Sequence, residues 1–175
     1  IVTPLSRGGI SIISGLALGI DAVAHKSALA SRGHTVAVLG SGIDDFSIYP
    51  STNRNLAKEI IASGGAIISE FPPGAPSLKH HFPIRNRIIA GMTLGTLVIE
   101  ADIDSGSLIT ARAALDENRD VFAVPGDIFR DTSRGSNNLI KMGAKVVDSA
   151  EEVAVALGIK ISAENDRLPV IPDTP

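Results

Sequence analysis

The chain has 175 residues, of which 44% are hydrophobic and 20% charged, with a formal net charge of -3 and a sequence pI near 5.8. This acidic balance excludes a protein that coats nucleic acid by bulk charge, so a polyanion site must be local. The absence of cysteine excludes a disulfide framework, a thiolate nucleophile and a cysteine zinc site. No apolar run approaches the roughly 18 residues that span a bilayer, and we expect a cytoplasmic protein without membrane contact.

Short apolar runs recur along the chain and alternate with amphipathic stretches. Because these runs are continuous rather than alternating in polarity, they predict buried parallel strands. The expected strands cover residues 10–14, 35–39, 66–69, 96–101, 121–125 and 144–148. Helices are expected over 21–32, 53–63, 107–118 and from Ser149 to Gly158, where Ser149 and Glu152 form a capping box. The pattern predicts an α/β fold with a Rossmann-like, doubly wound, mostly parallel sheet flanked by helices.

The two ends of the chain differ from this regular pattern. The first residues resemble the end of a helix that leads into the 10–14 strand. Residues 159–175 are polar and proline-rich, which is typical of a linker or tail. We therefore expect one domain over residues 1–158.

Glycines follow the first two expected strands, in the stretches 14–21 and 40–45. Backbone amides at Gly15, Gly40 and Gly42 are candidates for binding a phosphate. The alternative is that these glycines only permit tight turns. A dinucleotide site is disfavoured because an aspartate replaces the third glycine of its fingerprint, and no P-loop motif occurs.

The segment 104–112 opens a helix directly after the 96–101 strand. Its small residues Ser105, Gly106 and Ser107 leave unpaired amides and two hydroxyls at the positive end of that helix. This arrangement favours an anion site. The alternative is an ordinary serine N-cap.

The stretch HHFPIRNRIIAG, residues 80–91, carries the sharpest signal for function. Pro83 predicts a helix start, so Arg85 and Arg87 are expected at or near its first turn. Cations there oppose the helix macrodipole unless an anion is bound. No acidic residue occurs from 71 to 99, and Lys79 and Phe82 add a further charge and a base-stacking ring.

Two structural alternatives to a nucleic-acid site remain open for this stretch. Phe82 would lie in the core, or the arginines would pair with the strand-end residues Glu70 or Glu100. Asp21 and His25 share a helix face, which a polar surface explains more simply than catalysis. A metal site is not expected, because the adjacent histidines 80 and 81 point apart and no cysteine is near.

The chain resembles the core of the DNA-processing protein DprA (Smf) family over most of residues 8–153. The motifs that carry the resemblance are SGLALGIDAVAHKSAL, TVAVLGSGID, YP, SEFPPG, HFPIRNRIIAG, SGSLITA, RDVFAVPG and LIKMGAKVV. It implies a non-enzymatic, cofactor-free homodimer that binds single-stranded DNA and loads RecA recombinase in natural transformation. It further implies DNA contacts by Lys79 and Phe82, with Arg85, Asn86, Arg87 and Ser105–Ser107 in adjoining motifs.

The resemblance also exposes a departure from the family pattern. Relatives carry an earlier strand with a G-S-R motif, whose arginine contacts a DNA phosphate, and many carry flanking helical and winged-helix domains. These features are not found in residues 1–175. By analogy, we expect the dimer contact around residues 135–158.

An enzyme of a related fold is the alternative function. A nucleoside monophosphate phosphoribohydrolase would use Glu70 or Glu100 on a sugar. The P-G-G-x-G-T loop of that family is missing, since Asp127 and Ile128 follow Pro125 and Gly126.

Overall fold

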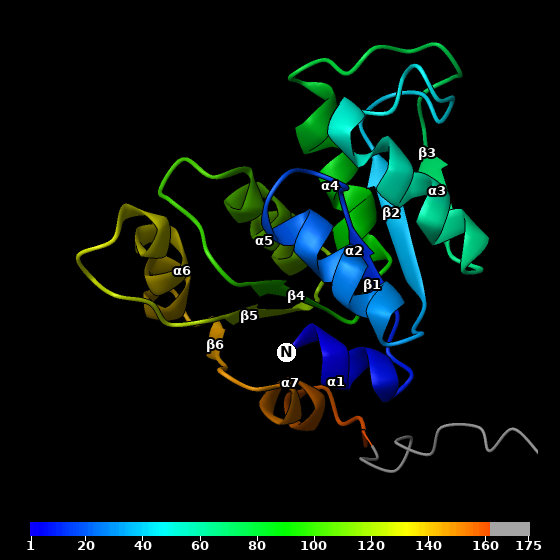
Figure 1. Ribbon diagram of the computed structural model, residues 1–175. Coiled ribbons are helices and arrows are strands. Elements are labelled where there is room, and N and C mark those ends of the chain that lie inside the picture. Colours follow the sequence, from blue (N-terminus) through cyan, green and yellow to red (C-terminus); the bar gives the residue numbers. More distant parts are fainter. Residues whose placement is uncertain (162–175) are drawn as a thin grey trace, which may run out of the picture.

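The computed structural model describes residues 1–161, which alternate between helices and strands (Figure 1). The elements in chain order are α1 (Val2–Arg7), β1 (Ile12–Ser14), α2 (Ile20–Ala30), β2 (Thr35–Leu39), the 3-10 helix η1 (Ser51–Asn53), α3 (Arg54–Ala62), β3 (Ala66–Ser69), α4 (His81–Gly91), β4 (Gly95–Val98), α5 (Gly106–Asp116), β5 (Asp120–Ala123), α6 (Asp131–Lys141), β6 (Lys145–Val146) and α7 (Ala150–Ala156). The tail expected over 159–175 falls mainly on residues 162–175, which lie outside the described residues.

All strand pairings are parallel, which confirms the Rossmann-like α/β prediction. The expectation of one continuous sheet is not met. Instead, the strands form two three-stranded sheets in the orders β1-β2-β3 and β4-β5-β6. β1 is an edge strand of the first sheet and β4 an edge strand of the second, and the two do not pair with each other. Residues of both strands line a cavity of about 1180 Å³.

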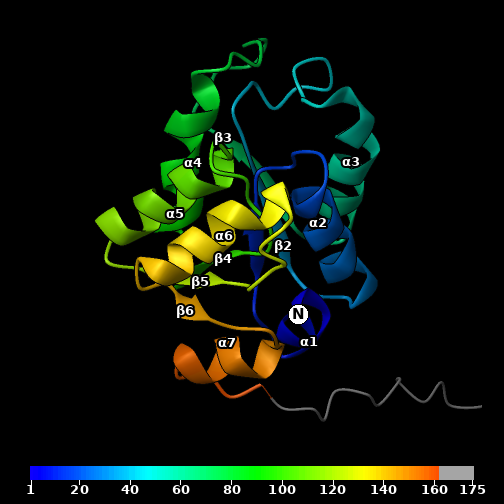
Figure 2. The same cartoon turned by 90° about the vertical axis from the view of Figure 1, so that its left-hand side faces the viewer.

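Helices cover the strands on two sides, α2 and α3 on one and α4 and α5 on the other (Figure 2). The first sheet packs against α2 and α3 through a cluster that includes Leu39, Leu56 and Ile60. The second packs against α5 and α6 through mostly small residues. A third cluster joins α1 to α7 around Phe122, and both views place these two helices side by side (Figures 1 and 2).

The sequence pattern located some elements better than others. β2 and β3 match their predicted ranges, and the Ser149 hydroxyl caps α7 by accepting a hydrogen bond from the Glu152 amide. The strand expected over 96–101 ends at Val98, and α6 was not predicted. α6 buries Ser133, Gly135 and Ser136 beside Leu139, so its buried face lacks the apolar repeat that signals a helix.

No helix within residues 1–161 is both long and apolar enough to cross a membrane.

Candidate nucleic-acid interface

The helix that carries the 80–91 motif begins earlier than expected. α4 starts at His81, so Pro83 lies in its first turn, where a missing N–H costs no intrahelical bond. Arg85 and Arg87 consequently lie in the second turn. They were predicted at or near the first turn, and in the second turn they oppose the helix dipole less, so their partners must be found in the tertiary structure.

Arg85 is buried, with only 5% of its surface exposed. Its Nη1 donates hydrogen bonds to the backbone carbonyls of Gly15, at 2.9 Å, and Val38. Burial lowers the pKa of Arg85, while the nearby Asp21 carboxylate raises it. Arg85 therefore links α4 to the carboxyl ends of β1 and β2. Direct contact of Arg85 with DNA stays a prediction, and the burial of its side chain argues against it.

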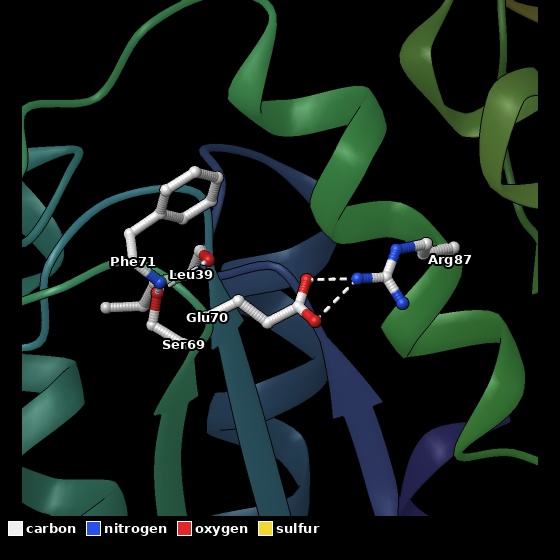
Figure 3. Close-up of polar contacts among 5 residues, drawn as sticks. All are labelled: Leu39, Ser69, Glu70, Phe71 and Arg87. Carbon is white, nitrogen blue, oxygen red and sulfur yellow. Dashed lines mark hydrogen bonds and ion pairs between the residues drawn. The ribbon is translucent and has the colours of Figure 1, made fainter.

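Arg87 lies two residues further along and faces solvent. Its Nη2 contacts both carboxylate oxygens of Glu70, the residue directly after β3 (Figure 3). This ion pair confirms the alternative expectation that a strand-end glutamate holds one of the arginines. The same contact engages the Glu70 carboxylate that a sugar-cleaving enzyme would use.

Asn86 connects the two motifs on which the prediction depends. Its side chain is buried, its Oδ1 accepts from Arg85 Nε at 3.1 Å, and its Nδ2 donates to the Gly106 carbonyl at 3.4 Å. Because Gly106 is the first residue of α5, this contact sets the start of α5 beside α4. The two motifs therefore lie side by side, and Asn86 acts as the structural link between them.

The start of α5 has features of both structures considered for the segment 104–112, an ordinary serine N-cap and an anion site. The Ser105 hydroxyl accepts from the Ser107 amide at 3.3 Å, as an ordinary N-cap does. Gly106 and Ser107 are nevertheless exposed, and no acidic residue lies in the first turn of α5. Asp104 directly precedes the N-cap, however, and anion binding at this helix start stays a prediction.

The three glycines predicted to bind phosphate are explained by close packing. A Cβ on Gly15 would collide with the Arg85 guanidinium, and one on Gly40 would lie 3.0 Å from the Phe82 ring. The Gly15 amide donates to Asp21 at 3.0 Å, and the Gly42 amide donates to the Ala75 carbonyl at 2.9 Å. Two of the three amides are thus already engaged, which favours the turn interpretation. Phosphate binding at these glycines stays a prediction.

Lys79 and Phe82 remain accessible at the carboxyl edge of the first sheet. Lys79 is exposed, and among the described residues it has no ion-pair partner. Phe82 is half-buried between Gly40 and the ring of Tyr49, whose centroid lies 6.0 Å away. The alternative of a core Phe82 is therefore not met, because part of its ring is exposed. The carbon of the Arg85 guanidinium lies 5.9 Å from the centroid of this ring, and the exposed Lys79 precedes Phe82 by three residues.

The large cavity collects most of the predicted site residues. Its lining includes Gly15, Phe82, Arg85, Asn86, Ser105, Gly106 and Ser107. Lys79, Arg87, Gly40 and Gly42 do not line it. Tyr49 and Thr132 line it as well, and sequence reasoning had given neither a role. Tyr49 is the only tyrosine of a chain with few aromatic residues, a signal that was available.

The Asp21 and His25 pair serves the structure. The Asp21 carboxylate accepts from the Gly15 and Ala17 amides, and His25 Nδ1 lies 2.7 Å from the Thr35 hydroxyl. Burial lowers the pKa of His25 to about 4, an effect that Asp21 opposes and Arg85 reinforces. In the part of the chain that the structure describes, no group of three or more His, Cys, Asp or Glu side chains is placed to hold a metal ion.

Comparisons with known proteins agree with these motifs. Residues 1–158 match the family described as DNA recombination-mediator protein A. The chain is 50% identical over 149 residues to protein Smf of Escherichia coli, and 50% identical over 142 residues to DNA processing protein DprA of Streptococcus pneumoniae. These alignments cover 85% and 81% of the chain but only 39% and 49% of the relatives, so the chain spans less than half of each.

Two solved structures share the fold. The X-ray structure of DprA from Streptococcus pneumoniae superimposes with a TM-score of 0.78 at 44% identity, over 87% of this chain and 53% of that chain. The DNA processing protein A of Helicobacter pylori, which binds single-stranded DNA, superimposes with a TM-score of 0.78 at 29% identity, over 89% of this chain and 69% of that chain.

Proposed function

Because the chain belongs to the DNA recombination-mediator protein A family, we propose that it binds single-stranded DNA across the carboxyl edge of its strands. The observation that carries this proposal is the pairing of Lys79, an exposed cation with no ion-pair partner in the described residues, with the half-exposed ring of Phe82. Cations that hold the backbone and rings that stack on bases bind single strands without reading their sequence.

The surroundings of this pair support the same ligand. From residue 71 to residue 99 the chain contains no Asp or Glu, so no carboxylate of this segment repels a phosphate. The open start of α5 offers a second anion site, which Asn86 holds beside α4. The H. pylori relative, similar over most of this chain, binds single-stranded DNA.

The test is a titration of fluorescent oligothymidylate with the wild type and with Lys79→Ala and Phe82→Ala. We expect Phe82→Ala to cost about 1 to 3 kcal/mol of binding free energy, the usual contribution of a stacked base. Lys79→Ala should weaken binding and reduce the salt dependence by the share of one phosphate, about 0.7 in the log–log slope.

Lys141→Ala is the matched control, because Lys141 ends α6 at the opposite edge of the strands and is also exposed. It should leave the affinity unchanged. Unchanged affinity of both Lys79→Ala and Phe82→Ala would refute the proposed site. An equal loss of affinity in these two variants and in Lys141→Ala would refute it as well.

We extend the proposal to partners and setting. The protein is a cytoplasmic homodimer that loads RecA recombinase on DNA and takes part in natural transformation, without a cofactor and without enzymatic activity of its own. Exposed apolar side chains in the last third of the described chain, Met142, Val146 and Val155, support a dimer face there. Light scattering of Val155→Glu tests the dimer, and RecA-dependent ATP hydrolysis on an oligonucleotide tests the loading.

Release of a free base from a panel of nucleoside monophosphates would instead favour a phosphoribohydrolase. No observation on this chain supports that activity over DNA binding, and Glu70 is held by Arg87.

A further inference from the structure

The loop between β5 and α6 presents a second aromatic side chain to solvent. Phe129 is 89% exposed and its neighbour Ile128 is 76% exposed. Aromatic residues make up only 3% of the chain, so an aromatic ring that is almost fully exposed to solvent indicates a binding role. We propose that Phe129 is a further base-stacking residue, which continues the single-strand path from the start of α5 onto the loop 124–130.

This loop is held in place by hydrogen bonds at both ends. Asn137 clamps Gly126, accepting from its amide at 3.1 Å and donating to its carbonyl at 2.9 Å. Asp127 accepts from the Phe129 amide at 2.9 Å through its carboxylate and from the Arg130 amide at 3.1 Å through its carbonyl. A ring that stays exposed on a fixed turn loses little conformational freedom when a base stacks on it.

The first residues of α6, which follow this loop directly, contact the segment that leads to α5. The Ala101 amide donates to the Thr132 carbonyl at 2.8 Å, and the Ala101 carbonyl accepts from the Gly135 amide at 2.7 Å. Only a few residues then separate Ala101 from Ser105, the N-cap of α5. Thr132 also lines the cavity that contains Ser105, Gly106 and Ser107. In our proposal, a strand that leaves the start of α5 passes along the start of α6 and continues onto the loop 124–130.

The two fully exposed phenylalanines, Phe129 and Phe46, both have carboxylates nearby and differ in the cation beside them. Arg130 follows Phe129, is exposed and has no ion-pair partner among residues 1–161. Asp127 and Asp131 flank Phe129, and Asp131 pairs with Arg134. Phe46 is equally exposed at 89% and follows Asp44 and Asp45, but the cations near it are engaged, because Lys58 pairs with Asp45 and Arg54 donates to the Phe46 carbonyl.

Phe46 therefore provides a matched control with the same exposure. The chain has no tryptophan, so Phe129→Trp and Phe46→Trp each introduce a single tryptophan that can be excited apart from Tyr49. We expect oligothymidylate to quench the fluorescence of Phe129→Trp and to leave that of Phe46→Trp unchanged. In parallel, Phe129→Ala should weaken binding by at least about fivefold, with no effect of Phe46→Ala.

Strand length separates the two parts of the path. Across oligothymidylates of about 4 to 16 nucleotides, the loss caused by Phe129→Ala should grow with length, because a short strand occupies only one part of the groove. The inference would be overturned if oligothymidylate did not quench the fluorescence of Phe129→Trp and if Phe129→Ala bound oligothymidylates of every length with unchanged affinity.

The inference rests on the proposed function, and the experiment distinguishes their failures. If Lys79→Ala and Phe82→Ala weaken binding while both Phe129 variants behave as wild type, only the extension of the path fails. If the wild type binds no oligothymidylate, both proposals fall.

Discussion

The two faces of α4 use the same residue type for opposite purposes. Arg85 is 5% exposed and bonded to backbone carbonyls of β2 and of the residue after β1, whereas Arg87 faces solvent and pairs with one carboxylate. The buried face of α4 holds the carboxyl edge of the strands together, and the accessible residues near the start of α4, Lys79 and Phe82, are the ones that we propose to bind DNA. Burial, rather than charge, separates the structural residues from the proposed binding residues here.

The largest expected effect tests the buried face. Arg85→Ala should lower the free energy of unfolding by about 3 to 5 kcal/mol, because it removes a packed side chain and leaves the Gly15 and Val38 carbonyls without their donor. Chemical denaturation measures this loss. Arg85→Lys should recover only part of it, since an ammonium lacks the fork of donors.

Gly15→Ala provides a check on the same contact. In the wild type the new methyl group collides with the Arg85 guanidinium, and in the Arg85→Ala background that collision is gone. The destabilisation by Gly15→Ala should therefore shrink in the double variant. Equal destabilisation in both backgrounds would show that Arg85 is not held as described.

A second effect of burial is a dependence of stability on pH. The pKa of His25 is about 4 in the folded chain, against about 6.5 for an exposed histidine, so the unfolded state binds more protons between these values. Stability is therefore complete above about pH 6.5 and falls by on the order of 2 to 3 kcal/mol as the pH drops to about 4.

Denaturation curves of the wild type and of His25→Gln across this range isolate the contribution. The slope between pH 4 and 6.5 should be smaller in the variant, whatever its stability at neutral pH. Identical slopes would show that His25 titrates normally and that its site is open to water.

The smallest expected effect belongs to the exposed face. Arg87→Ala should change the free energy of unfolding by less than about 1 kcal/mol, because its ion pair with Glu70 is more than half exposed at the arginine. A double-mutant cycle with Glu70→Gln measures the coupling. A loss comparable to that of Arg85→Ala would remove the distinction between the two faces.

The sequence predicted much of the fold because its signals are local. The apolar runs of β2 and β3 and the capping box of α7 are each readable within a few residues, and the structure confirms them. α6 was not predicted because Ser133, Gly135 and Ser136 make up most of its buried face and form no apolar repeat. Gly135 packs against the backbone after β4, and Ser133 packs against Gly126. The separation of the strands into two sheets likewise depends on which edges meet in space.

For the candidate site, the sequence alone predicted that ligands bind at the carboxyl edge of the strands and proposed Lys79, Phe82 and the start of α5 as binding residues. Only the tertiary structure decided that Arg85 is buried, that Arg87 has a partner and that Phe82 is half exposed. The reason is that the environment of a charged side chain depends on groups distant in the chain. Arg85 meets a carbonyl 70 residues away, and no local pattern encodes that contact.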